Sequence, residues 1–479
     1  MQMRHLSEAR CPVMISIMER KRKQWFQTAA AVCFWLFVWQ AAAFAVGQDL
    51  LLVSPFAVLK ALAALLVEPQ TWMTAAQTTL RVALGFFGGM ILGTMLAAAA
   101  FCIPAVVKIL LLPFMRTVRS IPLASFVILA LLWLKNAGNL SVLISFLMVF
   151  PLVYANVLSG IESVGKELPE MARVFRFSKG KTLRYLYLPA AAPHFFAACE
   201  VGIGLSFKSG IAAELIGITA GSIGERLYEA KLLFSTADLF AWTLLIVVLS
   251  FLCEKLVLVL GRMAFRYVLK VTKGSQQSPS FGEPQVIAAQ EAALSYESEM
   301  ILSGVSIEVA PGRCICVTAP SGKGKTTLLH VLLGLKKADA GQIAALRWSA
   351  LFQEDRLLED LSAVDNIALV SGLCEKELLK ELFLVGIEQE QALRPVKELS
   401  GGQRRRAAIL RAMLADGAQG IVMDEPFKGL DAQAKERTAA SVLRLQAGRA
   451  MLVMTHDVND ADLLNGELKE WADLEVKKN

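Results

Sequence analysis

The sequence predicts a polytopic α-helical membrane domain of about six transmembrane helices, followed by an α/β phosphate-loop domain. The 479-residue chain is 55% hydrophobic and has a mean hydropathy of +0.51, which is higher than is usual for a soluble protein. Its long apolar runs are confined to residues 25–260, whereas residues 285–479 have the composition of a globular domain. In that second region, a glycine-rich loop at 319–327 precedes an apolar strand that ends in two carboxylates, Asp424 and Glu425.

Composition also sets the expected segment boundaries. We predict a cytoplasmic N-terminal segment at 1–24, a transmembrane domain at 25–270, a linker at 271–285 and a nucleotide-binding domain at 286–479. Residues 273–285 are rich in Ser, Gln, Gly and Pro, which is typical of a flexible linker. The first apolar run is too long for a secretory signal, and Met1, Met14 and Met18 are alternative starts.

Six apolar stretches are candidates for membrane spans, because a bilayer core needs about 20 apolar residues of helix. They lie at 26–46, 77–101, 121–135, 139–161, 190–212 and 237–260. The third stretch is short, and residues 105–118 could continue it. Residues 50–67 are also apolar but contain Pro55 and Lys60, so we expect an interfacial helix there.

The distribution of basic residues orients these spans. If the N-terminus is cytoplasmic, most Lys and Arg residues between Arg20 and Lys273 fall in cytoplasmic segments. The outside segments would hold only Lys60, Lys135, Arg226 and Lys231. This bias predicts a cytoplasmic-membrane protein with both termini and the second domain in the cytoplasm. The net charge of +7 is therefore attributed to residues that flank spans, and no nucleic-acid partner is expected.

The eight cysteines show no disulfide or metal framework. Cys314 and Cys316 lie two residues apart on an expected buried strand, without a second pair or a histidine cluster beside them. Four others fall in or beside apolar spans, namely Cys33, Cys102, Cys199 and Cys253. This pattern is typical of a reducing cytosol and a membrane.

The glycine-rich loop has the context of a phosphate-binding loop, because an apolar strand at 314–318 precedes it and a Leu-rich helix follows. Its backbone N–H groups and the helix N-terminus can bind phosphate oxygens. We expect Lys325 to reach the β- and γ-phosphates of ATP and Thr326 to bind Mg²⁺. Ala319 replaces the usual first glycine and must therefore avoid positive φ. The expected phosphate ligands are Ser321, Gly322, Lys323, Gly324, Lys325, Thr326 and Thr327.

The acidic strand end at 421–425 supplies the second half of a nucleotide site. Asp424 is expected to hold Mg²⁺ directly or through water. Glu425 is placed to act as the general base on the attacking water. The alternative for this pair alone is an ordinary acidic loop after a strand.

Between these two elements lies the pentapeptide Leu399-Ser400-Gly401-Gly402-Gln403. With this signature, residues 290–460 resemble the ATP-binding-cassette (ABC) ATPase family. The resemblance implies that Ser400, Gly401, Gly402 and Gln403 act on ATP held by the phosphate loop of another subunit. Two such domains would then close head-to-tail around two ATP molecules.

The same resemblance assigns roles to four further residues. Gln353 resembles the glutamine that contacts Mg²⁺ and communicates with the membrane domain, and His456 resembles the switch histidine at the γ-phosphate. Asp431 matches the D-loop position. Tyr296 lies where the family places an aromatic residue against adenine, with an ordinary surface tyrosine as the alternative.

The segment at 162–189, between the fourth and fifth spans, resembles the cytoplasmic "EAA" loop of ABC importer permeases. Pro169 suits the first turn of a helix and Gly180 suits its exit, so we expect a coupling helix at 169–178. A charged connecting loop is the alternative. The coupling residues implied by the resemblance are Glu170, Met171, Ala172, Val174, Phe175 and Gly180.

Residues 50–260 resemble permeases of the nitrate, sulfonate and taurine importer group, which also contains importers of thiamine-precursor pyrimidines. The resemblance is carried by the segments at 79–86, 119–122 and 212–217. Within the fifth span and its end, Glu200, Lys208 and Glu214 are candidates for the solute pathway, because charges inside a bilayer usually face a cavity or each other. The alternative is an intrahelical pair of Glu200 with Lys208 that only stabilises the bundle.

Together these features predict a fused permease and ATPase subunit of an ABC importer, which uses ATP and Mg²⁺. Its expected partners are a second copy or a related half-transporter, an extracytoplasmic solute-binding protein and the lipid bilayer. An ABC exporter and a non-transporting regulatory ATPase are the alternatives, the latter if Ala319 abolishes turnover. The sequence leaves the transported solute open.

Overall fold

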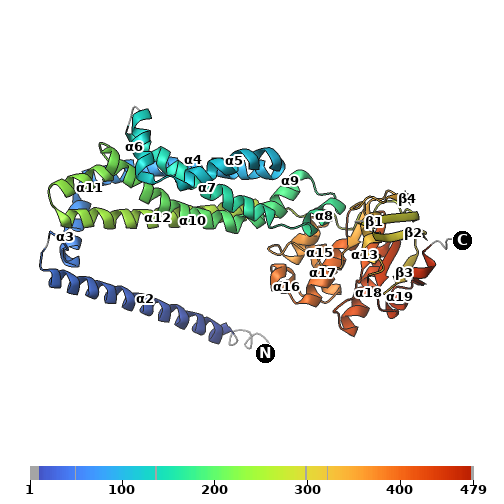
Figure 1. Ribbon diagram of the computed structural model, residues 1–479. Coiled ribbons are helices and arrows are strands. Elements are labelled where there is room, and N and C mark those ends of the chain that lie inside the picture. The colour runs from blue at the N-terminus through green and yellow to red at the C-terminus, as the bar shows by residue number, and fades with distance from the viewer. Residues whose placement is uncertain (1–9, 49, 135–136, 297–298, 321, 476–479) are drawn as a thin grey trace. The chain divides into compact units, whose positions relative to one another are not determined.

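The computed structural model describes residues 10–48, 50–134, 137–296, 299–320 and 322–475, in two compact units (Figure 1). The first unit comprises Met1–Ser159 with His194–Arg262, and the second comprises Gly160–Pro193 with Met263–Asn479. The loop between the fourth and fifth predicted spans therefore belongs to the second unit, together with the phosphate-loop domain. Ser321 lies outside the described residues, as does the side chain of Tyr296.

The first unit is helical, as the long apolar runs predict. Five of the described helices are long and apolar enough to cross a membrane, or six if one bent pair counts as a span. Residues 50–67, where an interfacial helix was expected, contain the short helix Pro55–Val67, which Ser54 caps. The helices of this region are α2 (Arg10–Val46), α3 (Pro55–Val67), α4 (Pro69–Cys102), α5 (Pro104–Ser120), α6 (Leu123–Trp133), α7 (Gly138–Glu162), α10 (Leu188–Gly217), α11 (Ile223–Leu232) and α12 (Thr236–Val268).

The third predicted span is not one straight helix. Residues Ile109–Val118 of α5 and Leu123–Trp133 of α6 are bent by 105° relative to each other. The break falls at Ile121, which has an extended backbone with φ −73° and ψ 127°, directly before Pro122. A proline disfavours the helical conformation of the residue before it, and this explains the break.

A seam of small residues packs α4 against α7. Gly85, Gly89 and Gly93 recur every fourth residue of α4, so they share one helix face. A Cβ added to Gly89 would lie 2.9 Å from the carbonyl oxygen of Phe146 and 3.0 Å from the backbone nitrogen of Phe150. The two backbones therefore approach each other closely only because these positions carry no side chain.

We expect Gly89→Ala to lower the free energy of unfolding by roughly 1–3 kcal/mol, because the added methyl group overpacks the helix contact. The measurement is the melting temperature of the full-length protein in lipid nanodiscs, which should fall. Gly88→Ala is the matched control, because its Cβ would make an ordinary contact at 3.4 Å with the Phe146 ring. Both variants gain the same helix propensity, so their difference isolates the helix–helix contact. Equal melting temperatures for the two variants would contradict this packing.

The second unit contains a five-stranded parallel sheet of order β5-β6-β7-β3-β8 and an antiparallel sheet of order β2-β1-β4. The central strands are continuous apolar runs, as expected for a parallel sheet that is covered on both faces. The strands are β1 (Ile287–Tyr296), β2 (Glu299–Val309), β3 (Cys314–Thr318), β4 (Ala340–Ile343), β5 (Trp348–Leu351), β6 (Gly420–Asp424), β7 (Ala450–Thr455) and β8 (Glu467–Glu470).

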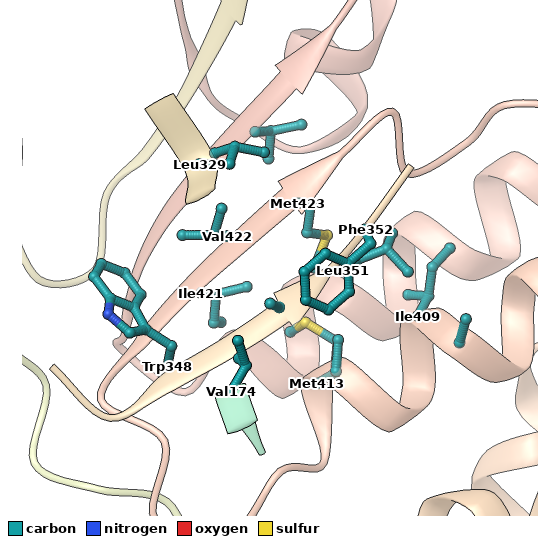
Figure 2. Close-up of a cluster of buried hydrophobic side chains, with 14 of the residues drawn as sticks. Val174, Leu329, Trp348, Leu351, Phe352, Ile409, Met413, Ile421, Val422 and Met423 are labelled. Carbon is teal, nitrogen blue, oxygen red and sulfur yellow. The ribbon is translucent and has the colours of Figure 1, made fainter. Parts of the chain in front are cut away.

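Helices cover the parallel sheet, and their apolar faces complete its core. The helices of this domain are α13 (Lys325–Leu332), α14 (Ala363–Ala368), α15 (Glu375–Leu384), α16 (Gln389–Ala392), α17 (Gly401–Met413), α18 (Ala432–Gln446) and α19 (Asn459–Leu463). Figure 2 shows Ile409 and Met413 of α17 close to Leu351 of β5 and Met423 of β6. Val174, from the loop between the fourth and fifth spans, belongs to the same cluster of buried side chains.

The predicted coupling helix is shorter than expected and has a different end. It is α8 (Glu167–Val174), and Arg176 ends it in a left-handed conformation with φ 54°. The amide of Phe177 donates to the carbonyl of Ala172, and the amide of Arg176 donates to that of Arg173, which together form a Schellman motif. Gly180 is not the exit. It lies inside the next helix, α9 (Lys179–Thr182), which Ser178 caps.

The segment 273–285, expected to be a flexible linker, makes specific contacts with the rest of the second unit in the described structure. Gln276 accepts a hydrogen bond from the amide of Cys374 at 2.9 Å, and Ser280 accepts one from Gly417 at 3.0 Å. The Phe281 ring lies 4.0 Å from the guanidinium of Arg449. Polar composition did not reveal these contacts, since backbone groups and one aromatic ring make them.

Candidate active site

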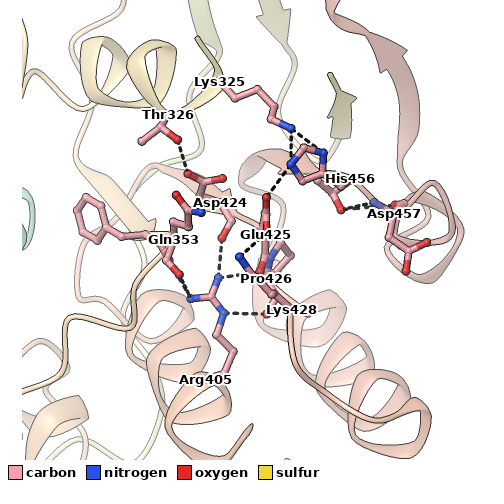
Figure 3. Close-up of polar contacts among 12 residues, drawn as sticks. Lys325, Thr326, Gln353, Arg405, Asp424, Glu425, Pro426, Lys428, His456 and Asp457 are labelled. Carbon is pink, nitrogen blue, oxygen red and sulfur yellow. Dashed lines mark hydrogen bonds and ion pairs between the residues drawn. The ribbon is translucent and has the colours of Figure 1, made fainter. Parts of the chain in front are cut away.

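The topology brings four of the expected motifs to one edge of the parallel sheet. The phosphate loop follows β3, Gln353 follows β5, Asp424 ends β6 and His456 follows β7. Because these strands are parallel neighbours, their carboxyl ends lie together, which is the usual ligand-binding edge of such a sheet. Figure 3 shows the resulting cluster.

The phosphate loop has the backbone that its glycines predict. Gly322 and Gly324 have φ of 86° and 94°, a region that other residues rarely adopt. Ala319 is not among the described non-glycine residues with positive φ, so its Cβ is accommodated. Its carbonyl oxygen accepts a hydrogen bond from Lys325 Nζ at 2.7 Å. Alanine at position 319, in place of the usual first glycine, is therefore compatible with the backbone of this loop.

Lys325 lies among acidic and basic neighbours at the start of α13. Its Nζ is 3.0 Å from His456 Nε2 and 3.1 Å from Nδ1. Burial lowers the pKa of Lys325 below its ordinary value, while the carboxylates of Glu425 and Asp424 oppose this effect. Phosphate oxygens at the same place would favour the charged ammonium, as expected for a group that binds ATP.

Thr326 and Asp424 form the oxygen pair that could bind Mg²⁺. Thr326 Oγ1 donates to Asp424 Oδ2 at 3.1 Å. Burial raises the pKa of Asp424, and the Thr326 hydrogen bond opposes this shift. No group of three or more His, Cys, Asp or Glu side chains that could hold a metal occurs among the described residues. Two protein oxygens suit Mg²⁺, which takes its remaining ligands from phosphates and water.

Glu425 has the geometry of a positioned carboxylate. Its Oε1 lies 3.0 Å from His456 Nε2, and its Oε2 lies 3.4 Å from Lys428 Nζ. Its backbone is in the left-handed region with φ 48°, which is unusual for a residue other than glycine. The structure thus brings together Lys325, Asp424, Glu425 and His456, as the motifs predict.

The signature residues lie at the start of α17. Ser400 caps this helix by accepting a hydrogen bond from the amide of Gln403 at 3.3 Å, and Gln403 Oε1 accepts one from the Ser400 amide at 3.0 Å. Gly401 and Gly402 line one hollow with Gln353, whereas Ala319, Lys323 and His456 line another. Within one chain, the signature and the phosphate loop thus lie in separate hollows. Asp431, the D-loop residue, caps α18 through the amide of Ala434 at 2.8 Å.

The predicted coupling helix lies beside Gln353. Glu167 and Leu168 line the same hollow as Gln353. Glu170 Oε2 is 2.9 Å from Arg356 Nη1, and the Phe175 ring is 5.2 Å from the guanidinium of Arg411. Met171, Ala172 and Val174 are buried in the apolar core that the phosphate-loop domain forms.

The three candidates for the solute pathway have different surroundings. Glu214 is fully buried, and it accepts a hydrogen bond from Thr78 Oγ1 at 2.9 Å and lies 3.5 Å from Arg81 Nη1. Glu200 and Lys208 are exposed on α10, and among the described residues no ion pair or hydrogen bond joins them. Eight residues of helix separate them by about 12 Å, so the alternative of an intrahelical pair is not formed.

Sequence reasoning missed several basic residues around this site. Arg405 and Arg411 are buried, and both donate to carbonyl groups of the 352–356 loop. Lys435 binds Asp457, next to the switch histidine, at 2.6 Å. The run Arg404-Arg405-Arg406 after the signature was the available signal, but such a run usually forms a solvated helix face.

Two family models match the chain, one over most of the helical region and one over the phosphate-loop domain. Residues 302–428 match the ABC transporter model, and residues 85–265 match the binding-protein-dependent transport system inner membrane component. A taurine import ATP-binding protein of Pseudomonas aeruginosa is 35% identical over 204 residues, which are 38% of this chain and 77% of that protein. An aliphatic sulfonates import ATP-binding protein of Burkholderia cenocepacia is 32% identical over 195 residues, 37% of this chain and 70% of that protein.

Among solved structures, a dimeric post-hydrolysis state of an ATP-binding cassette bound to ADP and phosphate is also similar. It is 25% identical, has a TM-score of 0.36, and the match covers 40% of this chain and 97% of that chain.

The chain belongs to the ABC transporter family. It is a multi-pass membrane protein that fuses a permease of the importer class to a nucleotide-binding ATPase in one polypeptide. The predicted family, fold class and enzyme class are thereby confirmed, and the exporter and regulatory-ATPase alternatives are not favoured.

Proposed function

We propose that two copies of this chain use ATP to import a small sulfonated solute delivered by an extracytoplasmic binding protein. The observation that carries the proposal is the position of α8, a permease loop helix whose Met171 and Val174 are buried in the core of the ATPase domain. This contact gives a route for coupling ATP hydrolysis to transport, because Glu170 of the same helix also binds Arg356 on the loop that bears Gln353.

The proposed chemistry assigns one task to each residue of the cluster. Lys325 and the backbone of 322–327 bind the phosphates, and His456 contacts the γ-phosphate. Glu425 accepts the proton of the attacking water. Thr326, Asp424 and Gln353 would hold Mg²⁺, which supplies charge neutralisation at the phosphates. Tyr296, at the end of β1, is proposed to contact adenine.

Two copies are needed because the signature and the phosphate loop of one chain line separate hollows. The start of α17 offers backbone N–H groups to an anion, so it can complete the site of a partner. We infer a homodimer with both ATPase domains on the cytoplasmic side, consistent with the basic residues that flank the spans.

The solute class rests on the ATPase relatives, whose names specify taurine and aliphatic sulfonates. Glu200 and Lys208 are proposed to face the pathway, because charged side chains on a membrane helix are costly against lipid. Glu214 is fixed by Thr78 and Arg81, so we assign it to the support of the bundle in the described conformation.

The test is transport by the full chain in proteoliposomes that contain ATP and Mg²⁺, with an extracytoplasmic solute-binding protein that binds taurine. We expect labelled taurine to accumulate only when ATP and the binding protein are both present. An excess of unlabelled ethanesulfonate should block uptake. β-Alanine, which replaces the sulfonate of taurine by a carboxylate, is the matched control and should not block it. Equal inhibition by β-alanine would contradict the sulfonate assignment.

A further inference from the structure

One buried arginine joins the two loops that carry the proposed catalytic residues. Arg405 is 4% exposed and lies on α17, two residues after the signature. Its Nη2 donates to the carbonyl oxygens of Asp424 at 2.6 Å and Glu425 at 2.7 Å, and its Nε donates to that of Pro426 at 3.1 Å. The guanidinium thus binds three successive carbonyl groups at the end of β6.

The other side of the same guanidinium binds the loop after β5. Arg405 Nη1 lies 2.8 Å from the carbonyl oxygen of Phe352 and 3.2 Å from that of Gln353. It also lies 3.1 Å from Asp355 Oδ1, which supplies a negative charge to the buried cation. Figure 3 shows Arg405 between Gln353 and the segment from Asp424 to Pro426.

The carbonyl of Glu425 matters because the residue has a strained backbone. A left-handed φ at a residue other than glycine is strained and persists only when neighbouring contacts hold it. Three contacts hold the Glu425 backbone: its amide donates to Met454 at 2.8 Å, and its carbonyl accepts from Arg405 at 2.7 Å and from the amide of Lys428 at 3.2 Å. Loss of the Arg405 contact would leave only the longer bond on the carbonyl, so the backbone could relax and move the carboxylate.

We propose that Arg405 is a positioning residue for ATP hydrolysis. It holds the Glu425 backbone and the Gln353 loop in a fixed position relative to each other. Only arginine offers five N–H donors in a planar fork, so glutamine or lysine cannot bridge both loops at once. This inference rests on the proposed role of Glu425 as general base. It adds a residue that acts through the backbone carbonyls of the two catalytic loops.

The test compares two buried arginines of the full-length chain in nanodiscs. Arg449 is also buried and donates to backbone carbonyls, those of Gln446 at 3.0 Å and Met413 at 3.0 Å, but none of its partners lies in the catalytic loops. For Arg405→Gln we expect kcat to fall roughly 10- to 100-fold, as for a displaced catalytic group, with a nearly unchanged KM for ATP. Arg449→Gln should lower the melting temperature but leave kcat nearly unchanged at a temperature where it is folded.

Arg405→Lys keeps the charge and should give an intermediate kcat, and it replaces the glutamine variant in the comparison if that variant does not fold. Equal losses of kcat in the Arg405 and Arg449 variants would overturn the positioning role. A normal kcat in Arg405→Gln, measured where Glu425→Gln has lost turnover, would also overturn the positioning role. If Glu425→Gln itself hydrolyses ATP normally, the proposed base is wrong, which is a different outcome.

Discussion

Replacing Glu425 by glutamine is expected to abolish most ATP turnover while ATP binding remains. A general base contributes typically about 10²- to 10⁴-fold to a rate, and glutamine cannot accept the proton of the attacking water. Glutamine has the same shape, and its amide oxygen can still face His456 Nε2, which lies 3.0 Å from Glu425 Oε1. We expect the 322–327 loop to bind the phosphates as before, because the change does not alter that loop.

The measurement is steady-state ATPase activity together with equilibrium ATP binding and native mass in nanodiscs. We expect the Glu425→Gln protein with ATP to be trapped as a closed pair of chains. Glu436→Gln is the control. Glu436 is exposed on α18, so this substitution makes the same chemical change away from the site. A normal hydrolysis rate in the Glu425→Gln protein would show that this residue is not the general base. A fully active single chain would contradict the composite site formed by two chains.

The local parts of this architecture could be predicted because local chemistry determines them. The phosphate loop combines a buried strand, glycines that tolerate left-handed φ and a helix start, all within residues 314–332. Apolar runs likewise mark the spans without knowledge of their packing. Pro122 and the four-residue recurrence of Gly85, Gly89 and Gly93 are local signals in the sequence for the helix break and for the close helix contact.

The parts that could not be predicted depend on contacts between residues that are distant in sequence. Arg405 is buried because carbonyl groups of two separate loops surround it, and carbonyl positions leave no pattern in the sequence. The contacts of the 273–285 segment could not be predicted for the same reason, since Gln276 pairs with the backbone of the 372–374 segment. The end of α8 at Arg176 rather than Gly180 reflects core packing of the helix, which outweighed glycine's preference for the left-handed position.

Reversing the charge of Glu170 is expected to separate ATP hydrolysis from transport. Glu170 Oε2 lies 2.9 Å from Arg356 Nη1, and the Arg356 side chain is only 7% exposed. Arg356 also has a left-handed backbone, with φ 46°, and its carbonyl accepts a hydrogen bond from Arg411 at 2.5 Å. Movement of α8 therefore acts directly on the loop between Gln353 and α14.

In Glu170→Arg, two guanidinium groups would face each other in a half-buried groove. Breaking a fully buried pair costs about 3–5 kcal/mol, and this pair is partly exposed, so we expect a smaller penalty that still displaces α8. Transport in proteoliposomes should fall at least about tenfold, which corresponds to about 1.4 kcal/mol of coupling. ATP hydrolysis should persist, because Lys325, Asp424 and Glu425 are not contacted by Glu170.

The charge swap makes this prediction specific to the pair. Glu170→Arg combined with Arg356→Glu restores opposite charges across the same contact, so transport should recover in part if the ion pair carries the coupling. Arg173→Glu is the matched control, because Arg173 is exposed on the same helix and also undergoes a charge reversal. Normal transport in Glu170→Arg, or equal loss in Glu170→Arg and Arg173→Glu, would mean that the loop is a plain connection. A double variant that transports less than either single variant would place the coupling in the apolar contacts of Met171, Val174 and Phe175 instead.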